Sequence, residues 1–186
     1  LATYPRVRYI RPETNPQPRA SNPIDSAMSR TLRVAINGTG FAADYTTATY
    51  GMIPHRNGVT IELAGVTSGR LENARRFADQ HGIGQAFASH AEMLAALKPD
   101  IDNIACANFA HGPYTIEAAE AGVPVIVLEK PPVVWPGYRD NAPASQTADA
   151  AQRKRESMDY LATVLDAVRS AGSKLLYAED FVYVDG

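Results

Sequence analysis

The chain has 186 residues, of which 45% are apolar and 20% are charged, and its 18 basic and 20 acidic side chains give a formal net charge of -2. This composition can supply a buried core, which excludes general disorder, and the balanced charge leaves no broad positive field for sequence-independent nucleic-acid binding. A single cysteine, Cys106, excludes an internal disulfide framework, and no run approaches the roughly 20 apolar residues of a membrane helix, so we expect a soluble, cytoplasmic protein.

The first 27 residues differ from the rest of the chain. They hold five of the 13 prolines together with four arginines, and they show neither helical nor strand periodicity. This composition predicts a disordered leader, or an upstream remnant that precedes the true start at Met28. We therefore expect residues 28–173 to form the folded domain.

From residue 32 onward, short apolar or β-branched runs alternate with longer helical patterns, which is typical of βαβ units on a parallel sheet. Strands are predicted at residues 32–37, 60–67, 85–88, 101–105, 124–128 and 174–184, and helices at residues 41–53, 71–81, 91–97, 112–121 and 148–171. Gly82 and Gly172 mark two helix ends, and Ser89 with Glu92 forms a capping box at the start of the third helix. The fold class that follows is α/β, a doubly wound parallel sheet of the Rossmann type, interrupted by a proline-rich loop at residues 131–143.

A G-x-G-x-x-A motif directly follows the first predicted strand and opens the first predicted helix. Its residues are Gly38, Thr39, Gly40, Phe41, Ala42 and Ala43. Gly38 permits a tight turn, Gly40 lets the backbone approach a pyrophosphate, and the helix start offers unpaired amides to the phosphates. The alternative is a tight βα turn without a ligand, but the place of the motif on the first strand of a repeated βα chain favours dinucleotide binding.

The end of the second predicted strand bears on the choice between NAD and NADP. It reads Val66-Thr67-Ser68-Gly69-Arg70 and lacks the acidic residue that accepts hydrogen bonds from the ribose hydroxyls in NAD-selecting sites. Ser68 can donate a hydrogen bond, and Arg70 offers a permanently charged fork to a phosphate. Although Arg70 could equally face solvent at a helix start, the pattern favours NADP as the cofactor.

Two further segments follow the fourth and fifth predicted strands, at the edge where open parallel sheets bind ligands. The candidate cofactor-binding residues there are Ala107, Asn108 and His111 after the fourth strand, and Glu129 and Lys130 after the fifth. Taken alone, His111 is a histidine at a helix start, and Glu129 with Lys130 is a solvated pair that opens a loop.

The remaining reactive side chains give no metal signature. His55, His81 and His90 stand at separate helix ends and form no ligand pattern, so no metal site is predicted. Cys106 is predicted to be buried in the fourth strand.

Taken in order, these motifs resemble those of the Gfo/Idh/MocA oxidoreductase family. The resemblance covers about residues 32–186 and is most specific at Glu129-Lys130-Pro131. It also includes Ala74, Arg76-Phe77-Ala78, residues 89–94, Asp100-Ile101-Asp102, residues 118–122, Ala171-Gly172 and residues 177–183.

The resemblance implies an NAD(P)-dependent oxidoreductase that transfers a hydride between the nicotinamide cofactor and a sugar, inositol or related polyol. It implies that Lys130 is the catalytic residue, between the nicotinamide ribose and the substrate, that Glu129 positions the lysine or the ribose, and that His111 lines the cofactor cleft. An ammonium group there could stabilise negative charge on the reacting oxygen or take part in a proton relay. A non-catalytic module that binds or senses dinucleotides is the alternative.

Members of the family carry a second α/β domain that forms the substrate pocket. The sequence ends at Gly186, about where that domain would begin, so we expect residues 174–186 to lead toward a C-terminal substrate domain that is missing from the chain. A truncated enzyme is favoured over a naturally short cofactor-binding module. We expect this fragment to bind dinucleotide without turnover, and the full-length protein to form a homo-oligomer.

Overall fold

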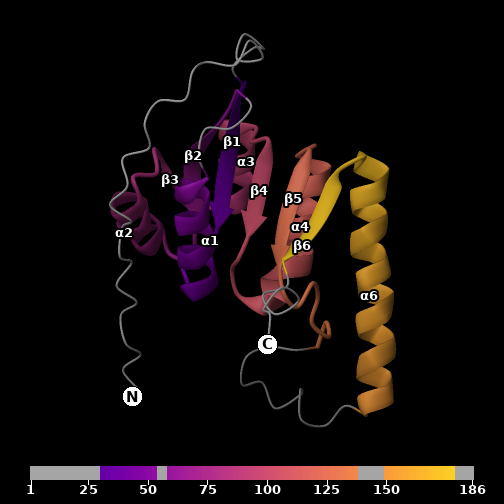
Figure 1. Ribbon diagram of the computed structural model, residues 1–186. Coiled ribbons are helices and arrows are strands. Elements are labelled where there is room, and N and C mark those ends of the chain that lie inside the picture. Colours follow the sequence, from indigo (N-terminus) through magenta and orange to yellow (C-terminus); the bar gives the residue numbers. More distant parts are fainter. Residues whose placement is uncertain (1–29, 54–57, 138–148, 179–186) are drawn as a thin grey trace, which may run out of the picture.

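A computed structural model of the chain describes residues 30–53, 58–137 and 149–178. They form a six-stranded parallel sheet in the order β3-β2-β1-β4-β5-β6 (Figure 1). The predicted leader at residues 1–27, residues 138–148 around the later part of the proline-rich loop, and the last part of the final predicted strand all lie outside the described residues.

The predicted α/β fold with a doubly wound parallel sheet is confirmed. The strands are β1 (Arg30–Asn37), β2 (Val59–Thr67), β3 (Ala86–Phe87), β4 (Ile101–Ile104), β5 (Val125–Glu129) and β6 (Lys174–Ala178). The helices are α1 (Phe41–Met52), α2 (Leu71–His81), α3 (His90–Leu97), α4 (His111–Glu120) and α6 (Ala150–Ala171), with a 3-10 turn, η2 (Asn108–Ala110), before α4. Strand β3 is shorter than predicted, because only two of its residues pair with the end of β2.

The helices cover both faces of the sheet. The chain runs outward from β1 to β3 and then crosses back to β4, and right-handed crossovers place the connecting helices on opposite faces before and after that reversal. Figure 1 shows α1 in front of the sheet and α3 and α4 behind it. The buried side chains Val34 and Ile36 of β1 pack with α1 and α2, whereas Ile126 and Leu128 of β5 pack with α4 and α6.

Local sequence signals set most helix boundaries. Helices α2 and α6 are followed by Gly82 and Gly172, as predicted. The predicted capping box holds the start of α3, since the Glu92 backbone N–H donates to Ser89 Oγ at 3.2 Å. The Glu92 carboxylate accepts the N–H of Ala88, at 3.3 Å, and α3 begins at His90, one residue earlier than predicted.

None of the helices within the described ranges is long and apolar enough to span a membrane. The feature of the fold that matters for function is the reversal of strand order between β1 and β4. The connections after these two strands leave toward opposite faces, which opens a crevice at the carboxyl edge of the sheet.

Candidate functional site

A cavity of about 670 Å³ lies at the carboxyl ends of β1, β2 and β4. The glycine-rich turn after β1 and the end of β2 line it on one side, and the loops after β3 and β4 line it on the other. The predicted cofactor-binding residues that line this cavity are Gly38, Thr39, Gly40, Phe41, Ala42, Ser68, Gly69 and Ala107. The fold therefore brings these eight residues, which come from three segments of the sequence, to one site.

The two glycines of the turn have different roles. Gly38 has a φ of +124°, and a Cβ atom there would lie 2.3 Å from the backbone oxygen of Ala105. Gly40 has a φ of -88°, and a Cβ atom on it would meet nothing within 4 Å. The fold therefore requires a glycine at position 38, whereas the glycine at position 40 leaves open space above the first amides of α1.

This difference predicts unequal effects of two alanine substitutions. Gly38→Ala should lower the free energy of unfolding by about 2–4 kcal/mol, because it adds both a disfavoured backbone conformation and a clash. Gly40→Ala should lower it by less than about 1 kcal/mol, the usual scale at an N-cap position. Urea unfolding of both variants measures the difference, and equal losses would contradict the separate roles of the two glycines.

The corner between the glycine-rich turn and β2 is polar and uncharged. The hydroxyl oxygens of Thr39 and Ser68 lie 3.1 Å apart, and none of the described residues that line the cavity is acidic. Arg70 is the exposed N-cap residue of α2 and lies just outside the lining. This corner offers hydroxyl groups and a nearby guanidinium group to an anion.

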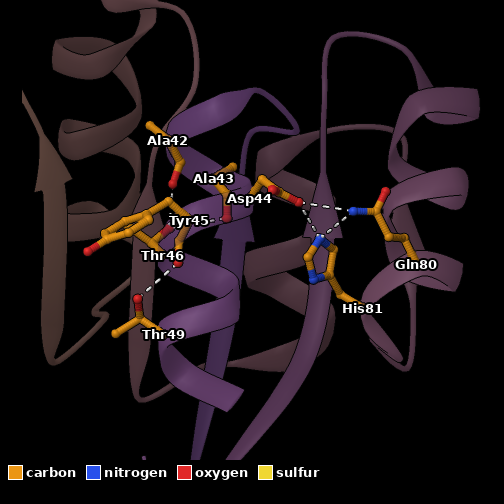
Figure 2. Close-up of polar contacts among 8 residues, drawn as sticks. All are labelled: Ala42, Ala43, Asp44, Tyr45, Thr46, Thr49, Gln80 and His81. Carbon is orange, nitrogen blue, oxygen red and sulfur yellow. Dashed lines mark hydrogen bonds and ion pairs between the residues drawn. The ribbon is translucent and has the colours of Figure 1, made fainter. Parts of the chain in front are cut away.

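A smaller cavity of about 300 Å³ lies beside this corner, between α1 and α2, and Asp44 and Arg76 are among its lining residues. The Asp44 carboxylate accepts a hydrogen bond from Gln80 Nε2 at 3.0 Å and lies 2.9 Å from His81 Nε2. Figure 2 shows Asp44 turned toward these two α2 side chains. The acidic group of this smaller cavity therefore ties α1 to α2.

Lys130 and Glu129 stand at the carboxyl end of β5 and do not line the large cavity. Glu129 is the last residue of β5 and is buried, and the Lys130 side chain is 45% exposed, with Nζ 3.8 Å from Glu129 Oε1. The order of the sheet places β4 between β5 and the glycine-rich turn after β1. The ammonium group is thus exposed at the same edge of the sheet, beyond one intervening strand.

His111 is fully buried at the start of α4 and is also not among the lining residues. Its Nδ1 donates a hydrogen bond to the carbonyl oxygen of Pro131 at 2.7 Å, and its Nε2 lies 3.2 Å from the carbonyl oxygen of Cys106. The ring therefore joins the loops that follow β4 and β5. The predicted contacts of His111, Asn108, Arg70, Glu129 and Lys130 with a cofactor stay predictions.

Three residues that the sequence did not connect form a polar network beside the cavity, in which His90 and Asp102 are buried, Glu117 is partly exposed and His90 lines the cavity. His90 Nε2 donates to Asp102 Oδ2 at 2.8 Å, and His90 Nδ1 donates to Glu117. The ring of Tyr114 lies against that of His90, with centroids 4.7 Å apart. Both ring nitrogens of His90 thus face carboxylate oxygens, and the ring joins α3, β4 and α4.

Burial and the neighbouring charges act in opposite directions on the pKa values of this network. Burial by itself lowers the pKa of His90, but the hydrogen bonds and charges of Asp102 and Glu117 outweigh it and raise the pKa above the ordinary 6.5. Burial raises the pKa of Asp102, against the opposing effect of His90. Among the described residues, no group of three or more His, Cys, Asp or Glu side chains is arranged to hold a metal ion.

Two more residues of the cavity were not foreseen. Cys106, predicted to be buried in a strand, is half-buried after the end of β4 and lines the cavity. Burial raises the pKa of its thiol to about 12, so the thiol stays protonated at neutral pH. Asn37, the last residue of β1, is buried in the cavity wall, and a polar side chain directly after the apolar run Val34-Ala35-Ile36 was the available signal.

Comparisons with known proteins agree with this geometry. Residues 32–159 match the Gfo/Idh/MocA oxidoreductase family, described by its NAD-binding Rossmann fold. The chain is 35% identical over 138 residues to D-glucoside 3-dehydrogenase of Escherichia coli (strain K12), an alignment that covers 74% of this chain and 36% of the relative.

Two solved structures share the fold. An NAD-binding oxidoreductase from Klebsiella pneumoniae superposes with a TM-score of 0.64 and 20% identity, covering 80% of this chain and 34% of that one. Biliverdin reductase from Synechocystis, in complex with biliverdin and NADP+, superposes with a TM-score of 0.57 and 21% identity, covering 78% of this chain and 37% of that one. The chain thus spans roughly a third of the length of these proteins. It belongs to the Gfo/Idh/MocA oxidoreductase family, and its six-stranded parallel sheet is the NAD-binding Rossmann fold of that family.

Proposed function

We propose that this chain binds a nicotinamide dinucleotide in the large cavity, with a preference for NADP, as part of an oxidoreductase that acts on the CH–OH group of a sugar or related polyol. The observation that carries the proposal is the glycine-rich turn at the carboxyl edge of the sheet, where Gly40 leaves open space at the start of α1. The likeness to a D-glucoside 3-dehydrogenase supports the substrate class. We also infer a cytoplasmic location and a homo-oligomeric full-length protein.

The residues present fit such a ligand. The cavity volume of about 670 Å³ lies within the range of small-molecule sites. The first amides of α1, which begins at Phe41, have no partners within the helix, and the helix dipole favours an anion there. The pyrophosphate therefore belongs at Gly38–Gly40, and the adenosine ribose belongs beside Thr39 and Ser68.

The nicotinamide ring, when bound, supplies or accepts the hydride. We assign Lys130 the catalytic role among the residues of this chain, because an exposed ammonium group at the sheet edge can donate a hydrogen bond to the reacting oxygen of a substrate and pass it a proton. Glu129 restrains that ammonium group from 3.8 Å away. His111 fixes the Pro131 carbonyl, and with it the backbone that follows Lys130.

Arg70 is the residue expected to decide cofactor preference. NADPH should bind more tightly than NADH, and Arg70→Ala should narrow the difference in binding free energy by roughly 1–3 kcal/mol. The variant removes the charged partner of the 2′-phosphate, which NADPH has and NADH lacks. Calorimetric titration with both dinucleotides measures the gap. Arg75→Ala, which removes another exposed arginine of α2, is the matched control and should leave the gap unchanged. Equal affinities of the unmutated chain for NADPH and NADH would contradict the preference for NADP.

A further inference from the structure

Asn37 is a buried polar residue that directly follows an apolar run. It ends β1 after Val34, Ala35 and Ile36, lies between β2 and β4, and is 2% exposed. Its amide nitrogen Nδ2 has no hydrogen-bond partner among the described residues. Burying an amide donor without an acceptor is costly, so an asparagine here disfavours the unliganded fold.

A second buried asparagine in the same sheet has internal hydrogen-bond partners for both its donor and its acceptor. Asn103 of β4 is also 2% exposed, but its Nδ2 donates to Thr46 Oγ1 at 3.2 Å and its Oδ1 accepts from the Tyr50 hydroxyl at 3.5 Å. Asn103 is not among the residues that line the cavity, whereas Asn37 is. The asparagine without an internal partner for its donor is thus the one that lines the cavity, with Nδ2 itself buried in the wall.

The cavity extends beyond the ribose corner at Thr39 and Ser68. Its walls there come from the loops after β3 and β4 and from the first turns of α3 and α4, and they include His90, Cys106 and Tyr114. A dinucleotide whose pyrophosphate lies at the glycine-rich turn and whose adenosine ribose lies at that corner must place its adenine in this part, because Lys130 and the expected nicotinamide end lie toward β5. This placement rests on the proposed function.

We propose that Asn37 recognises the adenine base of the bound dinucleotide through a hydrogen bond from its amide nitrogen to a ring nitrogen of the base. Asparagine amides pair well with adenine edges, which present ring-nitrogen acceptors. Because Nδ2 is buried in the cavity wall, the terminal amide must make a half-turn, which exchanges its nitrogen and oxygen with little change of shape and offers the donor to the cavity. The donor then acquires an acceptor in the complex, while the amide oxygen takes the buried position.

The test combines single-atom changes in the ligand with single changes in the protein. The probes are NADP+ and its 1-deaza, 3-deaza and 7-deaza adenine analogues, each with one ring nitrogen replaced by C–H, titrated by calorimetry. For the unmutated chain, one analogue should bind roughly three- to tenfold more weakly than NADP+, the range of one net hydrogen bond. For Asn37→Leu that analogue and NADP+ should bind equally, and for Asn103→Leu the original difference should persist.

Thermal unfolding of the unliganded variants gives an independent readout. Asn37→Leu should keep or raise the melting temperature, because no internal hydrogen bond of the Asn37 side-chain nitrogen is lost, whereas Asn103→Leu should lower it. Binding of all three analogues as tightly as NADP+, or a difference that survives in Asn37→Leu, would overturn the role of Asn37 while leaving the proposed function intact. Absence of binding by NADP+ itself would overturn both.

Discussion

Replacing His90 by leucine is expected to lower the free energy of unfolding by about 3–5 kcal/mol at neutral pH, the range for breaking a buried ion pair by removing one partner. His90 is the sole hydrogen-bond partner of the Asp102 carboxylate among the described residues, since Asp102 Oδ1 has none and Oδ2 bonds to His90. Asp102 is completely buried, so the variant leaves a carboxylate in the core without its compensating charge. Urea unfolding measures the loss.

The pH dependence of this stabilisation has a defined sign. Because the folded-state pKa of His90 is raised above the ordinary 6.5 of the unfolded chain, the stabilisation is fully present below that value and is lost as the pH rises through the folded-state pKa. The free energy of unfolding of the unmutated chain should therefore fall as the pH rises from the ordinary pKa of histidine through the raised folded-state pKa. His81→Leu is the control, because His81 pairs with the half-exposed Asp44 and should cost about 1 kcal/mol or less. Similar losses in both variants would show that His90 is not charged in the folded protein.

Substituting Lys130 by methionine in the full-length protein is expected to slow hydride transfer by a factor of about 10²–10⁴, the usual range for a lost acid or base group. Dinucleotide affinity should change little, because the Lys130 side chain is half-exposed and does not line the cavity. Steady-state rates and calorimetric affinities separate the two effects.

Lys154→Met is the matched control for Lys130→Met, since it removes an exposed lysine of α6. Its rate and affinity should equal those of the unmutated protein. A Lys130→Met variant that keeps its rate, or that loses affinity in proportion to rate, would remove Lys130 from the catalytic role.

The elements of this fold could be predicted from the sequence because their signals are local. The apolar run that ends at Asn37, the glycines that follow α2 and α6, and the Ser89–Glu92 cap each act within a few residues. The glycine-rich turn is also local, and its place directly after a strand was enough to predict the residues of this turn that line the cavity.

The polar interior could not be predicted, because its partners are distant in sequence. Asp102 and Asn103 are neighbours in β4 but face opposite layers, where Asp102 meets His90 of α3 and Asn103 meets Thr46 of α1, 57 residues away. Two adjacent polar residues between the two isoleucines of a short strand do not reveal those partners. The same holds for His111, whose two carbonyl contacts follow from how the loops after β4 and β5 pack.

Binding of a nicotinamide dinucleotide in the cavity at the carboxyl ends of β1, β2 and β4 can be followed by amide NMR spectra while the 15N-labelled chain is titrated with NADP+. We expect saturable shifts at Thr39, Gly40 and Ser68, with little change at Val164 in the middle of α6. Shifts that are absent at these three amides at saturating NADP+, or that gather on another part of the described chain, would contradict binding in this cavity.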